Sequence, residues 1–219
     1  MKRTIAIGDI HGCASTLLAL IHKLELTLDD EIYFLGDYID RGPNTKGVIH
    51  TILALQQMGY HIHTLRGNHE ELMMDSELGF FNFNTWIQNG GEQTLDNIGV
   101  DFFNEMPKAY QDFFENTKLY IENDKYIFVH AGLNFELEDI YSDKEAMLWV
   151  RGFEPLQPKL KDKILIHGHT PTPLVHILSQ KGNCYNIDGG CVYHYKPGYG
   201  YLVALVLETM QYVYVPYCG

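Results

Sequence analysis

The feature that most constrains the fold is a pattern repeated three times in the first third of the chain. An apolar run that predicts a strand ends each time in a glycine-flanked cluster of polar residues. The runs are "RTIAIG" (3–8), "EIYFLG" (31–36) and "YHIHTL" (60–65), and the clusters are "GDIHG" (8–12), "GDYIDRG" (36–42) and "GNHE" (67–70). Glycine lets the backbone turn sharply at these points and approach a ligand closely.

Helical patterns separate the three predicted strands. Apolar residues at helical spacing predict a helix over 15–24, and "TKGVIHTILALQQMG" predicts another over 45–59, with Gly59 as its stop signal. "HEELMM" (69–74) reads as the start of a third helix. This βαβαβ alternation predicts a parallel sheet with helices packed on it.

The rest of the chain changes character. Residues 76–116 read as mostly helical and rich in aromatic side chains. The last third reads as strands and hairpins with short turns, in the segments 118–132, 163–170, 176–188 and 201–216. We therefore predict one α/β domain spanning 1–219, in which two sheets pack together with helices outside.

The polar clusters are expected to meet, because ligands gather beyond the carboxyl ends of parallel strands. The residues brought to this rim would be Asp9, His11, Asp37, Asp40, Arg41, Asn68 and His69. Two later runs end in the same way, with His130 in one and with His167 and His169 in the other. Carboxylates, imidazoles and an amide oxygen suit Mn²⁺, Fe or Zn²⁺ better than a thiolate site would.

Each cluster is a weak signal by itself. Gly-Asp turns are common, and a single buried histidine such as His130 is more often structural than a ligand. Five clusters, each at the end of an apolar run, together favour a metal site. Six ligands for two ions leave positions open for water and substrate, as in a catalytic site.

Composition limits the kinds of partner that the protein is expected to bind. A formal net charge of −12 opposes non-specific nucleic-acid binding. Three of the four arginines, Arg41, Arg66 and Arg151, nevertheless lie in or beside the motifs, where they could bind a phosphate group. The longest apolar run, "YLVALVL" (201–207), is too short to span a bilayer, and no signal peptide is read at the start. Four cysteines without a CxxC pair suggest reduced thiols in a cytoplasmic protein.

The series "GDIHG…GDYIDRG…GNHE…HAG…GHT" resembles the phosphoprotein phosphatase family of calcineurin-like metallophosphoesterases. It is most similar to the bacteriophage lambda phosphatase type and its bacterial relatives. The motifs run from residue 8 to 170, and "NIDGG" (186–190) resembles a further family segment. The resemblance implies an α/β/β/α sandwich of two mixed sheets flanked by helices.

The resemblance also implies which residues hold two divalent metal ions, with Mn²⁺ favoured and Fe or Zn as alternatives. The first ion would be held by Asp9 and His11, both ions by Asp37, and the second ion by Asn68, His130 and His169. His167 could compete with His169 for the ligand role, but the family pattern "GHT" favours His169. Pro171 excludes the "GHxH" variant, which has two histidines there.

The implied chemistry is hydrolysis of a phosphomonoester by direct attack of a metal-bridging hydroxide. His69 would be the general acid, oriented by Asp40, while Arg41 and Arg151, with Asn68, would bind the phosphate. No phosphoenzyme is expected, because no cysteine or serine stands in a nucleophile motif. Arg66 matches no role in the family.

Three functions follow as hypotheses. The first is a protein phosphatase for phosphoserine and phosphothreonine, with phosphotyrosine as a further substrate. The alternative is a symmetrical bis(5′-nucleosyl)-tetraphosphate hydrolase, since the same motifs serve both. The third, a binding scaffold without activity, is disfavoured because all six ligands are present. We expect a monomer that acts on a phosphoprotein or a small phosphoester, with no nucleic-acid or membrane partner.

Overall fold

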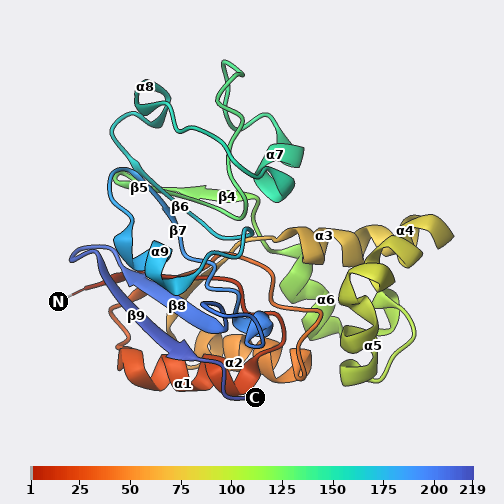
Figure 1. The fold of residues 1–219 in the computed structure, drawn as a ribbon. Coiled ribbons are helices and arrows are strands. Elements are labelled where there is room, and N and C mark those ends of the chain that lie inside the picture. The colour runs from red at the N-terminus through yellow and green to blue at the C-terminus, as the bar shows by residue number, and fades with distance from the viewer. Residues whose placement is uncertain (1) are drawn as a thin grey trace.

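Two mixed β-sheets form the centre of the molecule in a computed structural model that describes residues 2–219 (Figure 1). The first sheet has the order β3-β2-β1-β8-β9 and consists of β1 Thr4–Ile7, β2 Glu31–Phe34, β3 His61–Thr64, β8 Tyr201–Val206 and β9 Gln211–Pro216. The second has the order β4-β5-β6-β7 and consists of β4 Tyr120–Glu122, β5 Tyr126–Val129, β6 Ile164–His167 and β7 Cys184–Asn186.

Helices flank the two sheets. The outer side of the first sheet is covered by α1 Ala14–Leu24 and α2 Thr45–Gln57. A group of helices lies beside the sheets and consists of α3 Asn68–Asp75, α4 Phe80–Trp86, α5 Glu92–Ile98 and α6 Lys108–Glu115. The remaining helices are α7 Lys144–Trp149, α8 Gln157–Leu160 and α9 Leu174–Ser179. None of the helices in the described part of the chain has the length and apolar character that a membrane span requires.

Side-chain alternation along the strands builds separate core layers. Ile5 and Ile7 of β1 pack with the helix α1, whereas Ala6 between them belongs to the layer shared by the two sheets. Phe128 of β5 lies in that same layer, and its ring stacks on Tyr33 of β2 at a centroid distance of 3.9 Å. The expected α/β/β/α sandwich is therefore confirmed.

The parallel arrangement of β1, β2 and β3 is also confirmed, and their carboxyl ends lie at one edge of the first sheet. β5, β6 and β7 run parallel in the second sheet. The loops after β1 and β2 interlock, because the His11 N–H donates to the Asp37 carbonyl at 2.8 Å and the Gly12 N–H to the Tyr38 carbonyl at 2.8 Å. Gly59 was predicted to end the helix α2. It lies just after the end of α2 and has a φ of +89°, a conformation that glycine adopts easily.

One segment was predicted wrongly. Residues 176–188 were expected to be strand, but the chain forms helix α9 over Leu174–Ser179, and only Cys184–Asn186 is strand. Pro173 precedes this helix, and its carbonyl accepts a hydrogen bond from the Ile177 N–H at 3.1 Å. Ile177 is thereby buried in the layer between the sheets. The short helices α7 and α8 were not predicted either.

An ion pair at the start of the first sheet provides a test of stability. The Arg3 guanidinium donates to both carboxylate oxygens of Asp30, from Nε at 3.0 Å and from Nη2 at 2.5 Å, and the Thr27 N–H adds a bond of 2.8 Å. Burial opposes the charge on Asp30, but these bonds outweigh it and lower its pKa from 3.8 to about 2. A carboxyl whose pKa is lowered on folding stabilises the fold above its unfolded pKa and loses this effect as the pH falls through its folded pKa.

We expect Asp30→Asn to lower the free energy of unfolding at pH 7, with a pH-dependent part of ~2 kcal/mol. The difference from wild type should shrink as the pH falls from about 4 towards 2. Urea unfolding across this pH range measures it, with exposed Asp29→Asn as the control that should change little. A difference that stays constant with pH would contradict the role of the pair.

Candidate metal centre

The loops that carry the predicted site residues have an unusual backbone. Five of these residues have left-handed conformations, with φ between +46° and +69°, and they are His11, Asp37, Asp40, Arg41 and His169. Such a conformation costs a residue with a side chain ~1–2 kcal/mol. It persists only where the surrounding structure holds it, and such residues cluster at functional sites.

The carboxylate of Glu70 holds two of these loops together. It is fully buried, and it accepts hydrogen bonds from the N–H groups of Asp37 at 2.8 Å, Tyr38 at 2.8 Å and Gly67 at 2.9 Å. A side chain at Gly67 would not fit, because its Cβ would lie 2.1 Å from Asp37 Oδ1. The sequence placed Glu70 only within the start of the following helix, so its role in joining the loops after β2 and β3 was missed.

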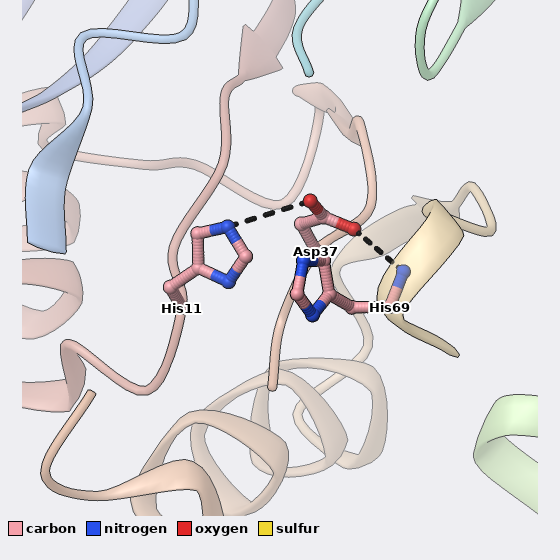
Figure 2. Close-up of side chains that lie close together, drawn as sticks. All are labelled: His11, Asp37 and His69. Atoms are coloured by element: carbon pink, nitrogen blue, oxygen red, sulfur yellow. Dashed lines mark hydrogen bonds and ion pairs between the residues drawn. The ribbon is translucent and has the colours of Figure 1, made fainter. Parts of the chain in front are cut away.

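Asp37 lies at the centre of the site. Its carboxylate is 3.4 Å from Nε2 of His11 and accepts the backbone N–H of His69 at 3.2 Å (Figure 2). It also lies 3.5 Å from Nε2 of His130. Burial opposes the charge, but the charges that the surrounding histidines carry when protonated hold the pKa of Asp37 well below its usual value. The side chain is therefore an ionised carboxylate with histidines on both sides.

The histidine rings are oriented by backbone carbonyls. Nδ1 of His11 donates to the Ile39 carbonyl at 2.8 Å, and Nδ1 of His130 donates to the Leu35 carbonyl at 2.9 Å. Burial lowers the pKa of both rings, so each is neutral with a lone pair on Nε2. Burial also lowers the pKa of His169 to about 3. His11 and His130 thus have the arrangement of metal-ligating histidines, whose second nitrogen donates to a carbonyl or carboxylate.

Oxygen and nitrogen atoms converge around the second half of the site. Oδ1 of Asn68 lies 3.0 Å from Nε2 of His130 and 2.9 Å from Nδ1 of His169. Since His130 uses its only proton on the Leu35 carbonyl, Nε2 has none to offer the amide oxygen. Close contact between such acceptors is favourable when a cation lies among them.

Two groups of side chains have the proximity that a metal ion needs. One consists of His11, Asp37 and His69, and the other of Asp37, His130 and His169, with ligand atoms within 4.8 Å of one another in each. Asp37 belongs to both groups. These nitrogen and oxygen donors therefore fit two divalent ions that share one carboxylate.

His69 is bound to a buried carboxylate. Its Nδ1 lies 2.7 Å from Oδ2 of Asp40, which also accepts hydrogen bonds from Trp86 Nε1 at 3.0 Å and, on Oδ1, from Thr94 Oγ1 at 2.7 Å. Burial lowers the pKa of His69, but the charges of Asp37 and Asp40 outweigh it and raise the pKa. The free Nε2 can serve as a proton donor or as a ligand. Trp86 and Thr94 were missed, since neither lies in a recognisable motif.

Asp9 follows a strand of the first sheet and contacts the part of the site that the second sheet carries. Its carboxylate accepts the backbone N–H of His169 at 3.2 and 3.1 Å, so the end of β1 is joined to the loop after β6. Burial and the nearby charges of Asp188 and Asp37 raise the pKa of Asp9. Asp9 belongs to neither group of three ligand atoms, although the structure places it beside the second one.

Two arginines lie at the edges of the cluster. Nη1 of Arg41 lies 2.7 Å from Nε2 of His11, and Nε of Arg151 donates to Nε2 of His169 at 3.2 Å. Arg66 is not among them, because it binds Glu71 at 3.1 Å and Thr117 at 3.1 Å and so braces helix α3.

His167 also lies outside both groups of ligand atoms. Its ring packs against Phe153 at a centroid distance of 5.2 Å, and burial lowers its pKa to about 4.

Two mixed sheets with a carboxylate and histidine cluster at their strand ends define a sandwich-type metallohydrolase. The chain belongs to the calcineurin-like phosphoesterase family, whose model matches residues 2–207. The resemblance is thereby confirmed at the level of this family, and the similarity to the lambda phosphatase type in particular is not.

Two curated relatives hydrolyse bis(5′-nucleosyl) tetraphosphates. The chain is 27% identical over 238 residues to the asymmetrical bis(5′-nucleosyl)-tetraphosphatase PrpE of Anoxybacillus flavithermus, covering 96% of this chain and 92% of the relative. It is 38% identical over 68 residues to a symmetrical bis(5′-nucleosyl)-tetraphosphatase of Escherichia coli (strain HS), covering 31% of this chain and 23% of the relative.

Solved structures share the fold. One, of a provisionally assigned diadenosine tetraphosphatase, has a TM-score of 0.70 at 19% identity and covers 99% of this chain and 94% of its own. Another, of a protein serine/threonine phosphatase from Saccharomyces cerevisiae, has a TM-score of 0.62 at 18% identity. The match covers 99% of this chain and 80% of that one. At these identities the likeness concerns the fold alone.

The two histidines after β6 allow a matched comparison. His169→Ala removes a member of the second ligand group, so we expect loss of bound metal and a fall of ~100-fold or more in phosphoesterase turnover. His167→Ala removes packing against Phe153 and should retain both metal and most activity. Metal content after dialysis and p-nitrophenyl phosphate hydrolysis with Mn²⁺ measure the two effects. The reverse order of losses would show that His167 is the ligand.

Proposed function

We propose that the protein is a metal-dependent hydrolase that cleaves a phosphoanhydride bond of bis(5′-nucleosyl) tetraphosphates. The observation that carries this proposal is the similarity to the PrpE tetraphosphatase over nearly the full length of both chains. The sequence-based alternative thus becomes the leading hypothesis. Phosphoserine and phosphothreonine hydrolysis has weaker support, because the protein phosphatase structure shares the fold at only 18% identity.

The six proposed metal ligands are Asp9, His11, Asp37, Asn68, His130 and His169. When bound, two divalent ions would lower the pKa of a water molecule and neutralise the charge of the phosphate group. Mn²⁺ is our first choice for both ions, with Fe or Zn as alternatives. The neutral imidazoles and the ionised Asp37 support this assignment, since metal ligands must be deprotonated.

The remaining polar side chains act on the substrate. Arg41 contacts His11 of the first ligand group, and Arg151 contacts His169 of the second. Both arginines would bind oxygens of the attacked phosphate, with Asn68 beside them. His69 would donate a proton to the departing oxygen, and Asp40 keeps its ring oriented. Because Asp40 is itself fixed by Trp86 and Thr94, the ring has little freedom to turn.

The proposed function is tested by the products formed from diadenosine tetraphosphate. With Mn²⁺ present we expect ATP and AMP, because the relative matched over its full length is an asymmetrical enzyme. ADP alone would favour the symmetrical cleavage predicted from the sequence. Chromatography of the nucleotides distinguishes the two, and a phosphoserine peptide assayed in parallel gives the comparison. A higher kcat/KM for the peptide would overturn the proposal in favour of a protein phosphatase.

The role of His69 is tested with two leaving groups. A serine alkoxide needs a proton to depart, whereas a terminal phosphate, with its second pKa of about 6, needs one much less. We expect His69→Asn to retain metal and to lose ~10²–10⁴-fold in phosphoserine hydrolysis, with a smaller loss on diadenosine tetraphosphate. Asp40→Asn should show the same ranking more mildly.

The measurements for this test are metal content and kcat/KM on both substrates. Equal losses on the two substrates would indicate that His69 positions the phosphate instead of donating a proton. Loss of metal would make His69 a ligand, as its proximity to His11 and Asp37 also permits.

A further inference from the structure

A cavity of about 610 Å³ opens next to Arg41. Its lining comes from the π-helix Ile87–Gly91 with the start of α5, and from residues 192–195, which begin in a 3₁₀-helix. Its lining includes Arg41, Asn89, Gln93, Asn97, Tyr193 and Tyr195. Since Arg41 also contacts His11, the cavity adjoins the metal centre and is open to a group attached to a bound phosphate.

One side of the cavity is aromatic and carries positive charge. The ring of Tyr193 lies 5.8 Å from Cζ of Arg41 and 4.5 Å from Nζ of Lys196. Tyr195 follows at 6.2 Å from Tyr193 with its ring nearly perpendicular. Nucleobases stack on aromatic side chains, and cations beside them bind the phosphates, so this surface suits a base joined to a polyphosphate.

The 88–97 segment of the lining offers amide groups. Oδ1 of Asn97 accepts the Thr45 N–H at 2.8 Å, which leaves the NH₂ group of Asn97 to donate. Nδ2 of Asn89 donates to the Thr85 carbonyl at 2.8 Å, which leaves its oxygen to accept. The side chain of Gln93 makes no hydrogen bond to any residue within 2–219 and can do both. Paired donors and acceptors of this kind bind the edge of a nucleobase.

The charge of its lining residues distinguishes this cavity from another large one. A cavity of about 740 Å³ near Arg151 is lined by four carboxylates, those of Glu136, Asp143, Glu145 and Glu154. The cavity next to Arg41 has no carboxylate among its lining residues, in a chain whose net charge is −12. We therefore expect an anionic nucleotide to be repelled by the cavity near Arg151 and to be accepted by the cavity next to Arg41.

We propose that the cavity next to Arg41 binds the nucleobase of the substrate, stacked on Tyr193 and contacted at its edge by the amides of the 88–97 segment. This inference rests on the proposed function, since it concerns a nucleotide substrate of the same site. It assigns recognition of the base to residues that lie outside the metal cluster.

The test compares substrates with and without a base. Tyr193→Ala should lower kcat/KM for diadenosine tetraphosphate about five- to a hundredfold, mainly through KM, relative to its effect on p-nitrophenyl phosphate. Tyr193→Phe retains the ring and should keep the wild-type ratio of the two substrates. Gln93→Leu, at a side chain that makes no hydrogen bond to Arg41 within 2–219, should also lower the ratio. Ratios unchanged in both Tyr193→Ala and Gln93→Leu would overturn the base site while the hydrolase function stands.

A binding measurement separates this inference from the proposed function. Calorimetry with the Mn²⁺-loaded protein should give tighter binding of AMP than of ribose 5-phosphate, and Tyr193→Ala should remove the difference. If diadenosine tetraphosphate is not cleaved but this difference is found, the base site stands and the proposed function fails. Equal binding of AMP and ribose 5-phosphate would overturn the base site, whether or not the tetraphosphate is cleaved.

Discussion

The buried carboxylate of Glu70 is the contact on which the site depends. It binds three N–H groups from the loops after β2 and β3, including that of Asp37, whose backbone is left-handed. Without it, three buried donors would be unpaired, which costs ~1–3 kcal/mol each. The left-handed backbone at Asp37 and the position of the central carboxylate are therefore both supported by one side chain that belongs to neither group of ligand atoms.

The centre so formed is shared by the two sheets. Asp37 and Asn68 follow strands of the first sheet, whereas His130 and His169 follow strands of the second. Their oxygen and nitrogen atoms are close together and buried, and Nε2 of His130 faces Oδ1 of Asn68 with no proton to offer, because the His130 proton is used on the Leu35 carbonyl. A divalent cation compensates such a cluster, so metal binding and the packing of the two sheets are expected to support each other.

Substrate choice, in contrast, is expected to depend on the residues that surround the cluster. The proposed metal ligands do not by themselves select a substrate, and the same fold occurs in a provisionally assigned diadenosine tetraphosphatase and in a protein serine/threonine phosphatase. The surroundings differ in charge: one cavity is acidic, and the other combines tyrosines, amides and cations. Selectivity for nucleotides can therefore arise without any change in the residues that hold the metal.

The sequence by itself determined the parallel strands, the two-sheet sandwich and the set of polar residues at the strand ends, because alternation and glycine-flanked motifs are local patterns. It did not reveal helix α9, where a short apolar stretch fits helix and strand alike. Nor did it reveal Trp86 and Thr94, which are 46 and 54 residues from Asp40 in the chain and bind it only after folding. The tertiary structure alone decided these contacts and the lining of the cavities, because both join residues whose spacing in the sequence carries no periodic signal.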